Sequence, residues 1–544
     1  MRCLVVIGIA VLTGTQLLAQ LPDSLARRVD SVFVALDKPT SPGCALGIYN
    51  AGDIVYTRGY GSANLEHGIP NTPRTVFDLG STSKQFTAMS VTLLEQDGKL
   101  SLDDDVRRWI PELPTYPTPV TIRQLVHHTS GLRDYLTLMW LRGVNFDGVT
   151  TSNDALSLIV RQRETNFQPG SEYLYSNSGY FLLSEIVRRA SGKTLAGFAG
   201  ERIFAPLGMS VTHFHDDHTM IVPNRATGYA ARDSGFAIAM SGFEQVGDGS
   251  VMTTVEDLAR WDRNFYEGRV GGRKLLESMH VPARLTGGRV LDYASGLVVG
   301  QYRGLRTVRH GGSWAGYRAE LLRFPDQRTS VAVLCNYSRS GPGRLAQRVA
   351  DVLLREHLTP VASTPGKGPS GTPAEPLARY VGSFRNAATD DIRTTSLRSD
   401  TLRIDFGGDT SLLRPLGAGR FAVEGTPWEV AFPTTDSLLE HAPNQPVGRF
   451  VRFERARPSA RDLEAYAGSY VSDELDVRWT IARDSSGLVA RIPGGDTLRL
   501  KPTVRDTFVG DGIVLTFRRA SGRVTGALLH AGRVRNIAFT RVQR

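Results

Sequence analysis

The alternation of apolar and polar residues predicts strands at both ends of a first region and helices between them. Residues 43–60 alternate like a two-stranded hairpin that turns at residues 50–53, and residues 81–96 follow a helical period. Residues 305–337 contain three strand-like runs in succession. We therefore predict an α+β domain over residues 20–358.

A stretch rich in Pro, Gly, Ser and Thr over residues 359–376 ends this pattern and is typical of an interdomain linker. Beyond it, short alternating strands are repeated. LARYVGSF at residues 377–384 matches LEAYAGSY at residues 463–470, and three further matches keep an offset of about 85 to 87 residues. We predict two tandem all-β domains, residues 377–457 and 458–544, each a small antiparallel β-barrel, with a sandwich as the alternative.

The first twenty residues have the order of a secretory signal peptide. Arg2 precedes an apolar run over residues 3–12, which is shorter than the roughly 20 residues that span a bilayer. Small residues follow, so we expect cleavage after Ala19. The mature protein is then periplasmic or secreted, with no stable membrane insertion.

The formal charge of the 544-residue chain is +10, with 41% hydrophobic and 22% charged residues. Its basic side chains are dispersed and form no Lys/Arg block, so we predict a solvated surface and no nucleic-acid partner. After signal cleavage, only Cys44 and Cys335 remain. Export allows a disulfide, but both lie in apolar strand-like runs, and we expect two buried free thiols.

The first candidate catalytic motif is the Ser81-x-x-Lys84 sequence at the start of a predicted helix. The spacing of three residues places both side chains on one helix face, where the lysine can take the serine proton. Unpaired N–H groups at a helix start can also stabilise an oxyanion. A bare Ser-x-x-Lys occurs often by chance, so alone it fits an ordinary N-capping serine with a solvated lysine better than a catalytic pair.

Two further motifs suggest how such a serine is assisted. Tyr175 can shuttle a proton and Asn177 can hydrogen-bond both a substrate carbonyl and the lysine. His310 ends a strand-like run and is followed by two glycines, including Gly312, which let a substrate lie close to the strand. The Ser313 N–H is then the second oxyanion donor beside that of the nucleophile.

Together these motifs resemble those of the serine β-lactamase and penicillin-binding-protein superfamily, in its class C-like branch. Further stretches that resemble this superfamily lie at residues 125–132, 206–209, 247–249, 316–317 and 324–325. The resemblance implies an antiparallel sheet flanked by helices, with an all-helical region. It implies Ser81 as nucleophile, Lys84 and Tyr175 as acid-base partners, and neither a metal nor an organic cofactor.

One departure bears on the substrate. Many β-lactamases and carboxypeptidases of this superfamily have a charged lysine where this chain has His310, which is mostly neutral at pH 7. Efficient β-lactam hydrolysis is therefore not expected. With two β-barrels, the layout resembles the D-aminopeptidases of the superfamily, in which a loop of the last barrel reaches the active-site cleft.

We accordingly expect a hydrolase that forms an acyl-enzyme and acts on peptides, amides or esters. Its substrate is a small molecule or a peptide, and a fragment of the cell wall is one possibility that the sequence leaves open. A carboxylesterase or weak β-lactamase of the same fold is the alternative. A non-catalytic envelope sensor that kept the pocket is a second alternative, from another class.

Residues 213–218 contain a His-x-His-x-Asp-His pattern, the zinc signature of metallo-β-lactamase-type hydrolases. No long apolar strand precedes it, and it lies inside the stretch that the serine superfamily explains. We interpret it as a polar loop and predict no metal site.

Overall fold

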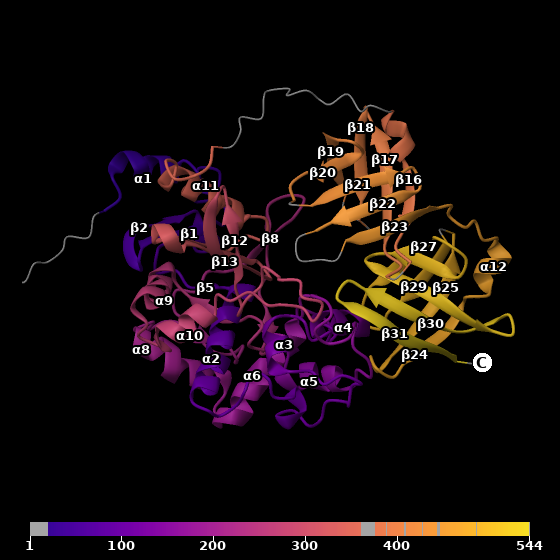
Figure 1. Cartoon of the computed structure of the whole chain (residues 1–544), viewed down its shortest axis with the longest axis horizontal. Helices are drawn as coiled ribbons and strands as arrows, with labels where there is room; N and C mark the ends of the chain where they lie inside the picture. Colours follow the sequence, from indigo (N-terminus) through magenta and orange to yellow (C-terminus); the bar gives the residue numbers. More distant parts are fainter. Residues whose placement is uncertain are drawn as a thin grey trace, which may run out of the picture.

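The computed structural model describes residues 20–360 and 376–542, apart from residues 388, 407–409, 427, 443–446 and 486. The predicted signal peptide and most of the predicted linker lie outside these residues. Figure 1 shows an α+β region, in indigo to salmon, beside two β-barrels in orange and yellow. No helix within the described ranges has both the length and the apolar composition needed to cross a membrane.

The α+β region contains one six-stranded antiparallel sheet, with the order β12-β13-β14-β15-β1-β2. Its strands are β1 (Cys44–Asn50), β2 (Asp53–Tyr60), β12 (Val298–Tyr302), β13 (Leu305–Trp314), β14 (Tyr317–Phe324) and β15 (Thr329–Cys335). The predicted hairpin is thus β1–β2, and the three predicted runs are β13, β14 and β15. The sheet brings the two ends of this region together.

Helices cover both faces of this sheet. The helices of the region are α1 (Asp23–Asp30), α2 (Lys84–Gln96), α3 (Ile122–Val126), α4 (Tyr135–Arg142), α5 (Ser152–Val160), α6 (Asn177–Ser191), α7 (Leu195–Ala199), α8 (Ala205–Leu207), α9 (Val255–Glu267), α10 (Gly272–Ser278) and α11 (Pro342–Leu353). Short 3-10 turns are η1 (Gly80–Ser83), η2 (Val106–Arg108) and η4 (Pro325–Gln327), and η3 (Gly200–Phe204) is a π-turn. α1 and α11 share one apolar cluster with one sheet face, whereas α9 packs on the other side with the all-helical part.

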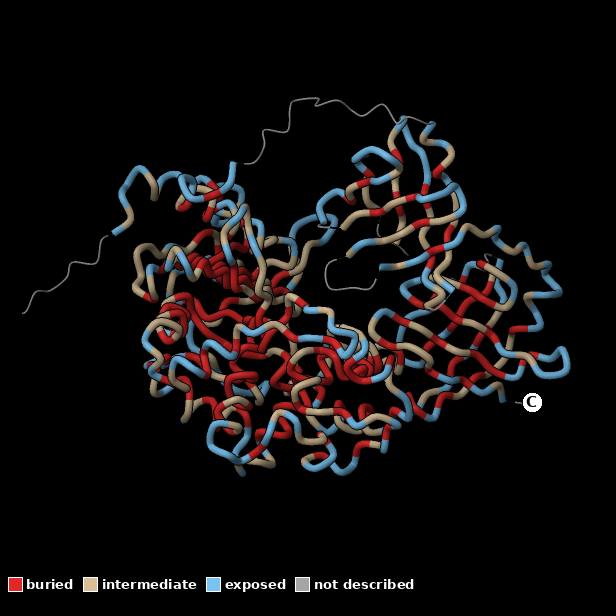
Figure 2. The backbone as a smooth tube through the Cα atoms, in the orientation of Figure 1, coloured by how far each residue is buried: buried red, intermediate tan, exposed pale blue. Residues whose placement is uncertain are grey.

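Small strands complete this region: β3 (Ser62–Asn64), β4 (Ile69–Pro70), β5 (Phe77–Asp78), β6 (Val149–Thr150), β7 (His213–Phe214), β8 (Tyr229–Ala231), β9 (Phe236–Ile238), β10 (Gly242–Phe243) and β11 (Val251–Thr253). Figure 2 shows buried backbone concentrated in the interior of the α+β region and on alternating positions of the barrel strands.

Cys44 and Cys335 form a disulfide, so the expectation of two free thiols is wrong. The two residues are direct cross-strand partners at the ends of β1 and β15. Each apolar run does form a buried strand, as expected, but the antiparallel register of the two strands also places the two sulfurs side by side. This bond spans 291 residues of sequence and links β1 and β15, which are the first and last strands of the sheet along the chain and neighbours within it.

The two C-terminal units are closed eight-stranded antiparallel barrels, which confirms the predicted fold class and removes the sandwich alternative. The first consists of β16 (Gly382–Arg385), β17 (Ile392–Arg398), β18 (Thr401–Asp405), β19 (Thr410–Gly417), β20 (Arg420–Val423), β21 (Glu429–Thr434), β22 (Ser437–His441) and β23 (Gly448–Phe453), preceded by η5 (Leu377–Tyr380). The second consists of β24 (Gly468–Ser472), β25 (Val477–Asp484), β26 (Gly487–Arg491), β27 (Thr497–Pro502), β28 (Thr507–Gly510), β29 (Ile513–Ala520), β30 (Arg523–Ala531) and β31 (Val534–Val542), preceded by α12 (Ala460–Glu464).

The internal repeat corresponds to equivalent core positions of the two barrels. Tyr380 and Phe384 of the first match Tyr466 and Tyr470 of the second, and all four side chains are buried. The repeated residues are therefore aromatic because each fills the same site inside a barrel. The exact domain boundaries remain predictions.

The second barrel is docked onto the α+β region through a buried arginine. The Arg133 side chain is 0% exposed and pairs with Glu474 at 2.6 Å, between Nη1 and Oε1. It also donates from Nε to the carbonyl of Arg535 at 2.9 Å and from Nη2 to that of Asn536 at 3.0 Å. Trp479 adds a bond from its indole N–H to the Leu141 carbonyl at 3.0 Å. These contacts make barrel and α+β region one packed unit.

We expect Arg133→Met to destabilise this docking, because it leaves the Glu474 carboxylate buried without a cation. Breaking one side of a buried ion pair costs on the order of 3–5 kcal/mol of unfolding free energy. The measurement is thermal and urea unfolding combined with limited proteolysis of the barrel.

The matched control is Arg163→Gln, which removes a neighbouring ion pair with Asp473 whose side chains are 72% and 76% exposed. This exposed pair contributes at most about 1 kcal/mol. Equal unfolding midpoints for Arg133→Met and Arg163→Gln would show that the buried Arg133–Glu474 pair does not stabilise the docking of the barrel.

Candidate active site

The predicted nucleophile Ser81 lies in η1, pressed against strand β13. The preceding Gly80 has a φ of 49°, and a Cβ added to it would come 2.6 Å from the Ser313 nitrogen. A Cβ on Gly312 would come 1.7 Å from the Leu79 carbonyl oxygen. Both positions therefore require glycine, and their absent side chains allow the strand to approach the serine turn.

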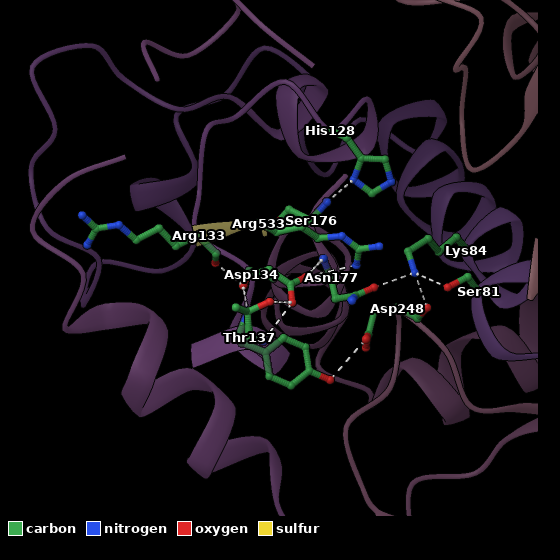
Figure 3. A network of polar contacts seen from close by, with 12 residues as sticks. Ser81, Lys84, His128, Arg133, Asp134, Thr137, Ser176, Asn177, Asp248 and Arg533 are labelled. Carbon is green, nitrogen blue, oxygen red and sulfur yellow. Dashed lines mark hydrogen bonds and ion pairs between the residues drawn. The ribbon is translucent and has the colours of Figure 1, made fainter. Parts of the chain in front are cut away.

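Lys84 is fully buried and connects three elements. Its Nζ donates to Ser81 Oγ at 3.0 Å, to Asn177 Oδ1 at 3.0 Å and to the Asp248 carbonyl oxygen. Figure 3 shows this fan of contacts, with Ser81 on one side and Asn177 on the other. The helical spacing predicted from the Ser-x-x-Lys motif is thus realised as a direct hydrogen bond.

Burial lowers the pKa of Lys84, because the charged ammonium loses its hydration in the protein interior. The nearby Asp248 carboxylate opposes this shift, and the Arg533 guanidinium adds to it. A lysine whose pKa is lowered is more often an uncharged amine near neutral pH. Its distance to Ser81 then suits it to accept the serine proton.

Tyr175 lies beside Lys84, but its hydroxyl is not ionised in the resting enzyme and so does not act as the base. Lys84 Nζ lies 4.8 Å from the centre of its ring, and its buried hydroxyl has no hydrogen-bond partner within the described part of the chain. Burial raises the pKa of Tyr175 well above its ordinary value. Ser81, which lies close to the tyrosine hydroxyl but outside full hydrogen-bond geometry, and Arg533 oppose this only in part. The tyrosine therefore stays protonated at rest, and its free hydroxyl suits a proton relay.

The Tyr175 ring is held by His128, whose ring centre is 4.1 Å away. His128 Nδ1 accepts the Ser176 N–H at 3.2 Å. Asn177 begins α6, and its own N–H donates to Asp134 Oδ2 at 2.8 Å. An acidic side chain at a helix N-terminus accepts a hydrogen bond from an otherwise unpaired N–H group, and its negative charge interacts favourably with the helix dipole.

The surroundings of His310 favour its neutral form. Burial lowers its pKa to about 3, and the neighbouring Lys84 adds to the shift. Its Nδ1 lies 2.6 Å from the Gly311 carbonyl, which only accepts, so Nδ1 carries the proton. Its Nε2 then accepts from the Tyr293 hydroxyl at 3.1 Å. Position 310 of strand β13 consequently presents no cation to a substrate.

A cleft of about 610 Å³ opens over these residues. Of the predicted site residues, six line it and Lys84 lies behind Ser81; the six are Ser81, Tyr175, Asn177, His310, Gly312 and Ser313. The structure therefore brings all seven predicted residues to one place. The cleft walls also include Asp248, from the family-like stretch 247–249, and residues that no motif indicated, among them Glu320, Arg344 and Arg533.

Arg533 comes from the second barrel, at the turn between β30 and β31. Its guanidinium carbon lies 4.8 Å from the Tyr175 ring centre, and Nη1 is 3.8 Å from Asp134 Oδ2. Its carbonyl accepts from Asn166 Nδ2 at 2.8 Å and from the Asp134 N–H at 3.4 Å. The family resemblance implied such a loop, but nothing in the sequence of this turn distinguishes it from other barrel turns.

The His-x-His-x-Asp-His pattern does not assemble as a cluster of ligands. Among the residues described, the one group with metal-binding spacing is Asp217, His218 and Glu244, and its first two members are exposed. His213 and His215 are not part of it. Burial lowers the pKa of His215 to about 4, which follows from its buried position.

Comparisons with known proteins agree with this geometry. Residues 29–355 match the family model described as Beta-lactamase. The chain is 30% identical to penicillin-binding protein 4* of Bacillus subtilis over 70% of this chain and 88% of that protein. It is 29% identical to a D-aminopeptidase of Cereibacter sphaeroides over 92% of this chain and 96% of that protein. The octameric penicillin-binding protein homologue of Pyrococcus abyssi has the same fold, with a TM-score of 0.57, 23% identity and coverage of 79% and 99% of the two chains.

We expect Arg533→Met to move the acidic limb of the kcat/KM profile to higher pH. Removing this positive charge raises the pKa of Lys84, so a higher pH is needed to free its amine. The expected displacement is on the order of half a unit to one unit. The measurement is kcat/KM against pH on an uncharged substrate.

The matched control is Arg535→Met, two residues further on in β31, because its guanidinium bonds Glu172 at 3.2 Å and the residue does not line the cleft. An acidic limb that moves equally in both variants, or in neither, would contradict the assignment.

Proposed function

The chain belongs to the Beta-lactamase family and is a serine hydrolase of this fold, and on that premise we propose that it is an exported enzyme that cleaves D-aminoacyl amides or peptides through an acyl-enzyme on Ser81. The observation that carries the catalytic part is the buried Lys84 amine, 3.0 Å from Ser81 Oγ. Export is supported by the signal-like order of the first twenty residues.

In the proposed mechanism, Ser81 Oγ bonds to the carbonyl carbon while Lys84 Nζ takes the hydroxyl proton. The carbonyl oxygen becomes an oxyanion, which the N–H groups of Ser81 and Ser313 stabilise. Collapse of this intermediate breaks the C–N bond, and the proton passes through the Tyr175 hydroxyl to the leaving nitrogen. Water then attacks the acyl ester, releases the carboxylic acid and restores the serine. No step of this scheme uses a metal or an organic cofactor.

Two observations support a D-aminoacyl substrate. The D-aminopeptidase of Cereibacter sphaeroides aligns over 96% of its length, which includes the region of both barrels. The neutral His310 also removes from strand β13 the cation that would attract the carboxylate of a β-lactam. A carboxylesterase or weak β-lactamase shares all the catalytic geometry and differs only in the acyl donor.

We expect a fluorophosphonate probe to label the wild-type enzyme once and to leave Ser81→Ala unlabelled. Lys84→Met should slow labelling by roughly 10²-fold or more, because the serine loses its base. Intact mass spectrometry of the exported protein measures both the label and the first residue, which is Gln20 if cleavage follows Ala19. Rapid labelling of Ser81→Ala would refute the nucleophile, and an unlabelled wild type would favour the non-catalytic sensor.

We expect D-alanyl p-nitroanilide to be hydrolysed roughly 10- to 200-fold faster than the L-isomer, the range that one misplaced substituent costs. Nitrocefin should be a poor substrate, and His310→Lys should raise its hydrolysis relative to the D-alanyl substrate by restoring the cation on the strand. The measurement is kcat/KM on this panel with p-nitrophenyl esters added. Turnover of short esters alone would favour the carboxylesterase, and rapid nitrocefin hydrolysis by the wild type would favour the β-lactamase.

A further inference from the structure

The cleft has an arm that the catalytic scheme does not use. It runs past Gly311 on β13 to the first turn of α11, and its wall includes Glu320 of β14. Glu320 is the cross-strand partner of Gly311, so its side chain stands on the same sheet face as that glycine. Gly312, the next residue of β13, faces the Ser81 turn, so Gly311 and Glu320 lie on the opposite face of the sheet. Strand β12 pairs with β13 only up to Arg309, so the cavity passes around the free edge of β13, and a substrate bound at the serine can extend past this edge into the arm.

Glu320 is a buried carboxylate with an incomplete set of partners. Its side chain is only 5% exposed, and its one ion pair is with Arg309, at 3.3 Å from Oε1. The Arg309 side chain is 42% exposed, so it compensates poorly for the lost hydration of the carboxylate. Oε2 forms no hydrogen bond with any described residue and faces the arm.

Two glycines keep Oε2 accessible. A Cβ on Gly311 would lie 2.9 Å from Oε2, and a Cβ on Gly343 would lie 3.2 Å from it. Neither glycine has a positive φ, so backbone conformation does not require glycine at these positions. The missing side chains leave space beside the carboxylate.

We infer that Glu320 binds a primary ammonium group of the substrate in this arm, an inference that deepens the proposed function by naming the charged group the enzyme selects. An ammonium carries three donors and a positive charge, which match the accessible, unpartnered oxygen of this largely buried carboxylate. Burial raises the pKa of Glu320 despite Arg309, and a bound cation would favour the ionised form.

Arg344 provides the opposite charge on the same arm. It lines the cleft, and its guanidinium forms no hydrogen bond or ion pair with a described side chain. A cation at this position opposes binding of a second cation at Glu320. Glu320→Gln and Arg344→Gln should therefore change ammonium preference in opposite directions, which a general loss of structure cannot do.

The ammonium can belong to the acyl donor or to the leaving group, and two matched substrate pairs distinguish these sources. The first pair is D-alanyl and isobutyryl p-nitroanilide, in which a methyl group replaces the ammonium. The second pair is the N-acetyl-D-alanyl amides of butane-1,4-diamine and of pentylamine, with the same replacement on the leaving group. The readout is the ratio of kcat/KM, charged over uncharged, near pH 7.

In the pair that places its ammonium at Glu320, we expect Glu320→Gln to lower this ratio by roughly 10- to 100-fold, as for a lost charged hydrogen bond. Arg344→Gln should raise it. Gly343→Ala, which favours the helix and narrows the arm, should lower it and remains informative if Glu320→Gln fails to fold. The inference is overturned if Glu320→Gln leaves the charged-over-uncharged ratio within about threefold of the wild type in both substrate pairs. If Glu320→Gln does not fold, the same result for Gly343→Ala overturns it.

This outcome is separate from failure of the proposed function. If no D-aminoacyl amide is hydrolysed in a Ser81-dependent manner, the substrate proposal fails, and the ratio is then measured on the corresponding esters. If the amides are hydrolysed but the ratio does not respond, only the role of Glu320 fails.

Discussion

The removal of the Lys84 side chain from water is the constraint on which the rest of the site depends. A buried ammonium is costly unless it loses its proton or finds acceptors; here burial lowers the pKa of Lys84, and three acceptors surround its Nζ. Its acceptors, Ser81, Asn177 and Asp248, come from the serine turn, the start of α6 and the loop before β11. The reactivity of the serine is therefore a property of how these three elements pack, and not of the Ser-x-x-Lys motif alone.

That packing extends to the C-terminal barrel through two consecutive residues. Arg133 bonds the barrel, whereas Asp134 accepts the first N–H of α6 and lies 3.8 Å from Arg533. Figure 3 shows Arg133, Asp134 and Asn177 in sequence toward Lys84. A shift of the barrel would move the backbone of Arg133, and with it the carboxylate that holds Asn177. Barrel docking and the lysine environment are thus mechanically coupled, and the barrel is part of the active site rather than an appendage.

Local patterns predicted what local physics determines. The helical spacing of Ser81 and Lys84, the strand runs and the barrel repeat all appear in short windows of sequence, and the structure contains each of them. What failed or was missing depends on long-range register. The pairing of Cys44 with Cys335 requires β1 and β15 to be neighbours, and Arg533 enters the cleft only because a barrel docks there. An apolar run is equally compatible with a free thiol and a disulfide, so nothing local could distinguish them.

The placement of charge separates this cleft from one built to capture an anion at the strand. Burial and the neighbouring Lys84 favour the neutral form of His310, so the arginine that lies against the acid-base residues is Arg533, which comes from the barrel and not from strand β13. Arg533 lies over Tyr175 and near Asp134, so its positive charge acts mainly on the acid-base residues Lys84 and Tyr175. A carboxylate on the substrate would have to compete with Asp134 for this arginine. The substrate that we propose, with an uncharged carbonyl group and an ammonium elsewhere on the molecule, meets no such competition.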